Sequence, residues 1–304
     1  MNINKFLLKL VNKKKYQKYK NEKKFRDKVM SFKKYTEPKI VEISKRINEK
    51  KEITFLHSGH LGDIINSLPL IKEISKSKKC KLFIEANKSL PSHAHDILHP
   101  FGNFFLTEEP IKKLFPLLNK QTYIDKVDFY NDQEIDINLN LFRDLPINFN
   151  LDSIRWYFHL AGIHGKLDEP YLINIDQHSI KNKIIIIRSR RRKNYFINYN
   201  FLKNYNDVLF LGLIEEFEEL KKEIPNLMFH DCKNFLEMAQ IINSSKLFIG
   251  NLSFGYTLAE ALKKPRLLES GPDFPLVYPN GKNAYDFYFQ NHFENFFKKL
   301  YLNK

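Results

Sequence analysis

The chain has 304 residues, of which 43% are hydrophobic and 14% aromatic. This composition excludes a disordered chain, and the length leaves room for two domains that each bury a core. The formal net charge is +15, but residues 1–51 hold 18 Lys or Arg against 5 Asp or Glu. The remaining body is therefore nearly neutral, and its charge does not indicate nucleic-acid binding.

The first 50 residues form a basic arm in which leucines and aromatic residues interleave with lysine. This composition is compatible with one or two amphipathic helices. Three readings stay open: contact with an anionic membrane surface, a solvated helical extension, and, as the third choice, RNA binding. No apolar run reaches the about 20 residues needed to cross a bilayer, and the first residues lack the features of a signal peptide. Cys80 and Cys232 form no CxxC pattern, so we expect a cytoplasmic protein without disulfides.

After the arm, the pattern predicts a strand, a turn, a helix and a second strand. Residues 52–57 and 81–85 are short apolar runs rich in strand formers, and residues 64–75 carry apolar side chains at helical spacing. This order is the βαβ unit of a parallel sheet. Residues 88–152 are less regular, and a helix ended by Gly162 follows.

The second half alternates more clearly between strands and helices. Its strands are apolar throughout, which is typical of strands that helices cover on both faces. The predicted strands are 183–188, 207–212, 227–230, 246–250 and 266–269, and the predicted helices are 215–224, 235–242 and 256–262. We therefore expect four parts: the arm (1–50), a Rossmann-like domain (51–170), a second one (171–283), and a C-terminal helix packing back across the domains (284–304).

The first candidate site is the turn Gly59-His-Leu-Gly62-Asp63 between a strand and a helix. Two glycines allow close backbone approach, and Asp63 stands at the carboxyl edge of a parallel strand, where open α/β sheets bind ligands. The turn lacks the third glycine of the dinucleotide-binding fingerprint. A simple helix-capping role for Asp63 is an equal alternative.

The second candidate site is the turn 250–257, Gly-Asn-Leu-Ser-Phe-Gly-Tyr-Thr, again between a strand and a helix. The first N–H groups of such a helix are free to bind an anion, and the helix dipole adds to the attraction. A diphosphate would fit there. Ser253 could instead be a hydrolase nucleophile, but the turn is one residue longer than G-x-S-x-G, which disfavours that reading.

The third candidate site is the basic run 188–193, Arg-Ser-Arg-Arg-Arg-Lys, at the end of a predicted strand. Arginine binds phosphate oxygens bidentately, so the run could face a phosphate in the cleft, hold a phosphorylated acceptor, or be solvated. Residues 93–99 contain His93, His95, Asp96 and His99, but their spacing matches no metal-binding pattern, and we expect surface histidines without a metal.

Taken together and in order, the two turns resemble those of the heptosyltransferase-type glycosyltransferases, family 9 of the GT-B class. That family opens with a strand, a turn ending in Gly-Asp and a helix containing Leu-Pro, and residues 56–70 fit this pattern. Its second half carries a strand, Gly-Asn-Asp-Ser-Gly, an alanine-rich helix and a proline, to which residues 246–265 are similar. The resemblance implies a GT-B fold, α/β, with two Rossmann-like domains whose parallel sheets face an interdomain cleft.

The resemblance also implies an inverting, metal-independent transferase that uses a nucleotide sugar as co-substrate and needs no cofactor. Asp63 would be the catalytic base towards a hydroxyl of a glycan or glycolipid acceptor. The donor-binding residues that it implies are Gly62, Arg188, Ser189, Lys193, Glu215, Asn251, Ser253, Phe254, Gly255, Thr257 and Glu260. Backbone N–H groups at 253–255 would bind the diphosphate, and Glu215 or Glu260 would hold ribose hydroxyls.

Two departures from the family pattern bear on activity. Leu252 stands where the family has an aspartate, and Thr257 stands where it has a histidine. These replacements leave the donor open and keep two further hypotheses in play: a non-catalytic sugar-nucleotide or glycan binding protein on the same fold, and an RNA-binding protein acting through its arm. For the transferase, we expect action on a cell-surface polysaccharide or lipopolysaccharide precursor at the cytoplasmic face of the membrane.

Overall fold

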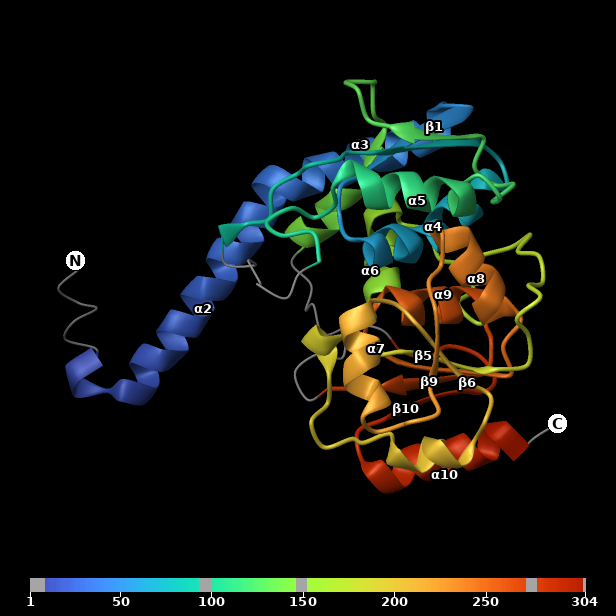
Figure 1. Cartoon of the computed structure of the whole chain (residues 1–304). Coiled ribbons are helices and arrows are strands. Elements are labelled where there is room, and N and C mark those ends of the chain that lie inside the picture. Colours follow the sequence, from blue (N-terminus) through green and yellow to red (C-terminus); the bar gives the residue numbers. More distant parts are fainter. Residues whose placement is uncertain (1–8, 93–99, 146–151, 272–277, 303–304) are drawn as a thin grey trace.

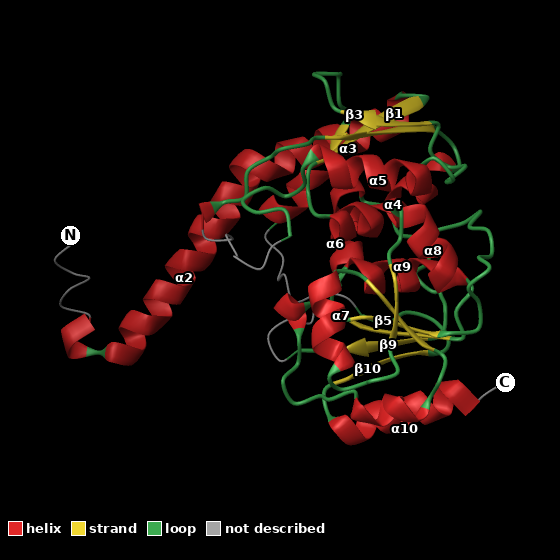
Figure 2. Cartoon of the chain, in the orientation of Figure 1, coloured by secondary structure: helices red, strands yellow, loops and turns green. Residues whose placement is uncertain are grey.

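The protein is described by a computed structural model that covers residues 9–92, 100–145, 152–271 and 278–302. Two parallel sheets lie at opposite ends of the body, with helices between them and on their outer faces (Figures 1 and 2). The expected α/β architecture with two parallel sheets is confirmed. Among the described residues, no helix is both long and apolar enough to cross a bilayer.

The first sheet has the strand order β3-β2-β1-β4, and all its pairings are parallel. Its strands are β1 (Glu52–His57), β2 (Lys79–Ile84), β3 (Lys126–Phe129) and β4 (Ile137–Asn138). The segments that connect and follow these strands form α4 (Leu61–Ser75), α5 (Glu108–Leu118), the 3-10 helix η3 (Leu139–Asp144) and α6 (Ser153–Ala161). The predicted βαβ unit is β1-α4-β2.

The second sheet has the strand order β10-β9-β8-β5-β6-β7, also parallel throughout. Its strands are β5 (Ile184–Ile187), β6 (Val208–Leu211), β7 (Met228–His230), β8 (Leu247–Asn251), β9 (Arg266–Glu269) and β10 (Ala284–Phe287). Its helices are η4 (Arg190–Arg192), η5 (Asn200–Asn204), α7 (Ile214–Lys221), α8 (Phe235–Asn243), α9 (Phe254–Leu262) and α10 (Gln290–Leu302). All residues of β5, β6, β8 and β9 are buried, as the apolar runs predict, and in β9 this burial includes the charged Arg266 and Glu269.

One hydrophobic cluster extends through both halves, and a second lies within the second half. Helices α4, α5 and α6 of the first half and α8 and α9 of the second lie between the two sheets (Figure 1). Buried side chains of α4, such as Ile65, and of α9, such as Leu258, belong to the same cluster. Helix α4 packs directly against α9, so the sequence-separated turns that precede these helices are brought to the same place.

The C-terminal segment 284–304 differs from the expected helix across the domains. Its first residues form the edge strand β10, which pairs with β9. Helix α10 then packs on the second sheet at β9 and β10, where Phe293 and Phe297 join the core of that half. The apolar side chains of α10 pack on the second half, which explains why the helix does not reach the first half (Figure 1).

The basic arm is helical, but only the second of its two long helices contacts the body of the protein. Helix α2 (Lys13–Ser31) has no buried side chain and projects away from the body (Figure 1). A five-residue π-helix, η1 (Phe32–Thr36), connects it to α3 (Glu37–Glu49). Helix α3 lies against the first sheet, where Ile43 is buried and the Arg46 Nη1 donates to the Ile135 carbonyl at 2.7 Å. These contacts attach α3 to the first half.

Candidate functional site

A cavity of about 670 Å³ opens between the two halves. Its walls come from the carboxyl ends of β1, β5, β6, β7 and β8 and from the N-terminal turns of α4, α5, α8 and α9. This is the edge at which parallel α/β sheets bind ligands, because the loops after the strands converge there. Both turns that the sequence singles out, with Asp63 and Ser253, contribute to this wall.

Asp63 lies in the first turn of α4, and its side chain is 24% exposed. Its Oδ2 accepts hydrogen bonds from the Arg143 Nη2 at 2.7 Å and from the His60 backbone N–H at 3.2 Å. The second of these bonds caps the helix, so Asp63 does serve as a cap. No described residue donates a hydrogen bond to its Oδ1. The described residues therefore bond to one carboxylate oxygen and not to the other.

The charge state of Asp63 follows from opposing influences. Burial raises the pKa of its carboxyl, but the nearby Arg143, followed by His60 and His57, outweighs burial and holds the pKa below the ordinary value of 3.8. Arg143 itself lies over the Phe142 ring, 4.3 Å from its centroid, which fixes the guanidinium beside the carboxylate. Asp63 is thus ionised at neutral pH and able to accept a proton.

A buried polar chain supports the backbone of this turn. The His57 Nδ1 accepts the Gly59 N–H at 2.9 Å, so its Nε2 carries the proton and donates to the Tyr157 hydroxyl at 3.0 Å. Tyr157 in turn donates to the Asp63 carbonyl at 3.0 Å. Burial lowers the pKa of His57 to about 3, which keeps this tautomer neutral. These hydrogen bonds hold the backbone of the turn through side chains that stay uncharged at neutral pH.

Gly59 is the point of closest approach in this turn, and we predict that Gly59→Ala damages it. An added Cβ would lie 2.8 Å from the Arg143 Nη2 and 2.8 Å from the Asp63 Oδ2. We expect the free energy of unfolding to fall by about 1–3 kcal/mol, as for other overpacked sites, and the Asp63–Arg143 pair to separate. Urea denaturation measures the first effect. Gly271→Ala is the matched control, because no described atom lies within 4 Å of a Cβ there; equal losses for both variants would contradict the prediction.

The second turn ends at the N-terminus of α9. Ser253 is its N-cap, but its hydroxyl turns back to the Asn251 carbonyl at 3.1 Å and does not cap the helix. No acidic side chain stands in the first turn of α9. Gly255 lets the helix approach β5 closely, because a Cβ there would overlap the Ile187 side chain. The positive end of the α9 dipole therefore faces the cavity with no acidic side chain in its own first turn, although Asp63, Glu216 and Asp231 of other elements also line the cavity.

The two turns touch each other across the cavity floor. A Cβ on Gly62 would lie 3.3 Å from the Thr257 Oγ1, so the first turn of α4 and the first turn of α9 are in contact. The Thr257 hydroxyl itself donates to the Ser253 carbonyl at 3.2 Å. Gly62, Asp63, Ser253, Phe254, Gly255 and Thr257 all line the cavity. The structure thus brings together residues that are about 190 positions apart.

Ser189 lines the cavity, whereas Asn251 supports it from behind. Asn251 is fully buried, and its amide both accepts the Ser189 N–H at 2.9 Å and donates to the Ser189 carbonyl at 2.7 Å. This pair of bonds ties the loop after β5 to the end of β8. Asn251 therefore positions a cavity residue and does not itself face the cavity.

Two of the expected phosphate-binding cations lie elsewhere. The Arg188 side chain is buried, and its Nε donates to the Glu269 Oε2 at 2.7 Å. The Lys193 Nζ pairs with the Glu219 Oε1 at 2.6 Å. Neither residue lines the cavity, because nearby carboxylates of the second half hold both side chains. Arg191 and Arg192, from the same run, line it in their place.

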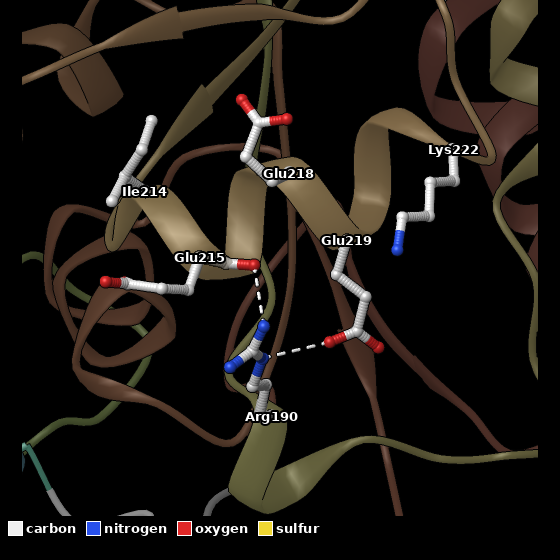
Figure 3. A pocket seen from close by; sticks show the side chains of 6 residues that line it. All are labelled: Arg190, Ile214, Glu215, Glu218, Glu219 and Lys222. Carbon is white, nitrogen blue, oxygen red and sulfur yellow. Dashed lines mark hydrogen bonds and ion pairs between the residues drawn. The ribbon is translucent and has the colours of Figure 1, made fainter.

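The two glutamates expected to hold ribose hydroxyls also lie outside this cavity. Glu260 is fully buried and pairs with Lys263 and with the Arg266 Nε, the latter at 2.5 Å. Glu215 lines a separate surface depression on α7, where its carbonyl accepts a hydrogen bond from Arg190 (Figure 3). Both residues lie on helices, as the sequence predicts, but neither lines the cavity.

Arg143 is the main site residue that the sequence did not indicate. It lies in η3, just after the short strand β4, and β4 pairs with β1 next to the Asp63 turn. Polar residues directly after the alternating segment 135–141 were the available signal, since the carboxyl ends of parallel strands meet at one edge. Among the described residues, no three His, Cys, Asp or Glu side chains gather as a metal site. His93, His95, Asp96 and His99 lie outside the described residues.

The sequence matches no protein-family model, and no curated protein matches it. Solved structures do. A glycosyl transferase of family 9 from Veillonella parvula DSM 2008 is similar at a TM-score of 0.53 and 12% identity, covering 82% of this chain and 89% of that one. E. coli heptosyltransferase WaaC with ADP gives a TM-score of 0.52 at 9% identity, covering 82% and 97%.

The dodecameric iron-containing heptosyltransferase TibC, in complex with ADP-D-beta-D-heptose, gives a TM-score of 0.52 at 12% identity, covering 78% of this chain and 62% of that one. At these identities the likeness establishes the fold. The chain has the two-sheet GT-B fold of the family 9 glycosyltransferases and heptosyltransferases, as the resemblance of its two turns implied.

Proposed function

We propose that this protein is an inverting glycosyltransferase that moves a sugar from a nucleotide-sugar donor to a hydroxyl of a cell-surface glycan or lipopolysaccharide precursor. One observation carries the proposal: the ionised carboxylate of Asp63, one oxygen of which accepts no hydrogen bond from a described residue, and the N-terminus of α9, which has no acidic side chain in its first turn, line the same cavity. The first can take a proton from a hydroxyl, and the second can hold a diphosphate. The fold shared with glycosyltransferases supports the same chemistry.

In the proposed reaction, the Asp63 Oδ1 takes the proton of the acceptor hydroxyl as its oxygen attacks the anomeric carbon. A carbon–oxygen bond forms on one face of the sugar while the bond to the diphosphate breaks on the other, which inverts the configuration. The nucleoside diphosphate leaves with the bonding electrons. Backbone N–H groups at 253–255, the α9 dipole, Arg191 and Arg192 stabilise the negative charge that develops on it. These groups complete the step without a metal ion.

Donor binding at α9 is tested by Ser253→Asp. Aspartate is a favourable N-cap, so we expect the melting temperature without ligand to stay the same or rise. The added charge should repel a diphosphate and weaken binding of nucleoside diphosphates by about 10-fold or more. Thermal shift with ADP, UDP and GDP measures both effects, because a ligand raises the melting temperature by mass action. Asn12→Asp, at the N-cap of the distant α2, is the matched control; unchanged ligand shifts in Ser253→Asp would contradict diphosphate binding there.

The arm supports a location at the cytoplasmic face of a membrane. Helix α2 is exposed along its whole length and rich in lysine, and each basic residue near an anionic surface contributes about 1 kcal/mol. The acceptor proposed here would be anchored in that membrane. A non-catalytic binding protein on the same fold is the second candidate, favoured by the Thr257 hydroxyl donating to its own turn. Loss of Asp63 separates the two candidates.

A further inference from the structure

A buried amide close to Asp63 has one polar atom without a described partner. Asn66 lies three residues after Asp63 on α4, is 4% exposed and lines the cavity. Its Nδ2 donates to the Ser153 Oγ at 3.0 Å, whereas its Oδ1 is buried and accepts no hydrogen bond from any described residue. Buried polar atoms are almost always hydrogen-bonded in folded proteins. An exception on a cavity wall therefore indicates a place where a ligand supplies the partner.

The chemistry of this amide favours a hydroxyl as the missing partner. As the bonds stand, the free position is the Asn66 Oδ1, which needs a donor. Turning the amide by 180° would let its oxygen accept the Ser153 hydroxyl proton and would leave its nitrogen in need of an acceptor. A hydroxyl can donate and accept, so it satisfies the amide in either orientation.

Two packed helices present this amide together with Asp63. Residues three apart on a helix lie on one face, with their Cβ atoms about 5–6 Å from each other, and Asp63 and Asn66 have this spacing on α4. Ser153 and Trp156 have the same spacing on α6, which packs against α4 (Figure 1). All four residues line the cavity. A ligand hydroxyl at Asp63 and another at Asn66 would thus be close enough to belong to one sugar ring.

The charges on this part of the cavity wall balance one another. The Asp63 carboxylate pairs with Arg143 at 2.7 Å, and Glu109 pairs with Lys113 at 3.8 Å. The N-terminus of α6, where Ser153 lies, is capped by the Asp152 side chain, so an anion gains little there. The described groups of the first-half wall therefore favour a ligand that has hydroxyls and no charge.

We propose that Asn66 and Ser153 form a subsite for an uncharged sugar ring of the acceptor. Asn66 binds a second hydroxyl of the ring whose first hydroxyl reaches Asp63, and in this way it selects which hydroxyl is presented to the base. Ser153 is a positioning residue, because it holds the amide through the bond to Nδ2. The inference deepens the proposed function and rests on it for the role of the sugar as acceptor, whereas binding of the sugar is measured without donor or transfer.

The tryptophan of the chain reports on this subsite. Trp156 is the only one in the sequence, lines the cavity beside Ser153, and stacks on Phe142 with the ring centroids 5.4 Å apart. A sugar ring at the subsite changes the surroundings of this indole, so its emission should change in a saturable way. The probes are the methyl glycosides of glucose, galactose and mannose, added to the full chain without nucleotide. Isothermal titration calorimetry gives the same dissociation constants independently.

The decisive comparison pairs a protein variant with a ligand that lacks one hydroxyl. Asn66→Leu should weaken binding of the best glycoside by about 10-fold, as expected for one lost hydrogen bond. One monodeoxy derivative of that glycoside should lose about as much with the parent protein. Asn66→Leu should bind this derivative and the complete glycoside equally, because the hydrogen bond that the derivative lacks is already absent. A purely structural role of Asn66 would not produce this loss of discrimination.

Asn226→Leu is the matched control. Asn226 also has a buried Oδ1 without a described partner, and its Nδ2 donates to the Tyr205 carbonyl at 2.8 Å, but it does not line the cavity. This variant should bind the glycosides as the parent does. Melting temperatures show whether the variants are folded. If Asn66→Leu does not fold, Ser153→Ala takes its place and should weaken the same glycoside, because the amide loses the bond that holds it.

The possible results separate this inference from the proposed function. The subsite is overturned if no glycoside binds the parent, if the folded variant binds as tightly as the parent, or if Asn66→Leu still discriminates against the deoxy derivative. Tighter binding of methyl glucuronide than of methyl glucoside would contradict an uncharged ring. Glycoside binding that depends on Asn66, without any binding of nucleoside diphosphates, would retain the subsite and contradict the transferase. Nucleoside diphosphate binding without glycoside binding would remove the subsite alone.

Discussion

Replacement of Asp63 by Asn is expected to lower the rate constant of sugar transfer by about 10²–10⁴-fold, the usual contribution of a general base. Asparagine keeps the shape of the side chain and one oxygen for the His60 N–H, so the helix cap is retained. It cannot take the proton of the acceptor. Binding of nucleoside diphosphates should remain, because the α9 N-terminus is untouched. Single-turnover transfer assays and thermal shift measure the two quantities separately.

The pH dependence gives a second signature of the same residue. Because the pKa of Asp63 is held below 3.8, the acid limb of kcat/KM should lie below the ordinary aspartate range. The lowered pKa of Asp63 also stabilises the folded protein at pH values above the pKa of this residue in the unfolded chain. This contribution to the free energy of unfolding is lost as the pH falls through the lower pKa of the folded state. Asp176→Asn, at a side chain 65% exposed, is the matched control. Unchanged turnover in Asp63→Asn would favour another base, and absence of turnover in the parent with every donor would favour the binding protein.

Replacement of Arg188 by Met is expected to lower the free energy of unfolding by about 3–5 kcal/mol, since it leaves a buried carboxylate without its cation. Among the described residues, the Asn194 N–H and the Tyr199 hydroxyl would still donate to Glu269, at 2.6 and 2.8 Å. Both side chains are nearly inaccessible, 4% for Arg188 and 0% for Glu269, so water cannot replace the lost partner. Urea denaturation measures the change.

Two controls interpret that loss. Arg190→Met removes a cation whose side chain is 44% exposed and pairs with Glu219, so its effect should be about 0–1 kcal/mol. The double variant Arg188→Met with Glu269→Gln removes both charges and should recover part of the stability, because an uncompensated charge is the main penalty. Comparable losses for Arg188→Met and Arg190→Met would contradict a structural role for the buried pair.

The sequence predicts the fold best where the local apolar pattern of an element matches its burial in the structure. In residues 183–269 the strands β5, β6 and β8 are almost entirely apolar and buried, whereas β7 is partly exposed and β9 carries Arg266 and Glu269, so apolar runs and their lengths predict most of the parallel sheet. Strands are harder to predict from the sequence between residues 88 and 152 of the first half, because β3 is only partly buried and β4 has two residues. The pairing of these short strands depends on contacts with β1 and β2 that no local window contains.

Individual side-chain directions were harder to predict than the turns that carry them. Successive side chains of an extended segment point to opposite faces. In the run after β5, Ser189 faces the cavity, whereas Arg188 beside it faces the interior and meets Glu269, 81 residues away. Arg143 was missed for the same reason, since its partner Asp63 lies 80 residues upstream. Such pairings are decided by the packed fold.

The contact between the first turns of α4 and α9 bears on when the protein can act. The proposed proton acceptor belongs to one half and the proposed diphosphate site to the other, and the α4–α9 contact that joins the halves also sets their relative position. Any motion that parts the halves to admit a large acceptor must also pull these groups out of register. A bound donor would then be exposed to water only while the proposed base and the proposed diphosphate site are apart, which protects the donor from hydrolysis.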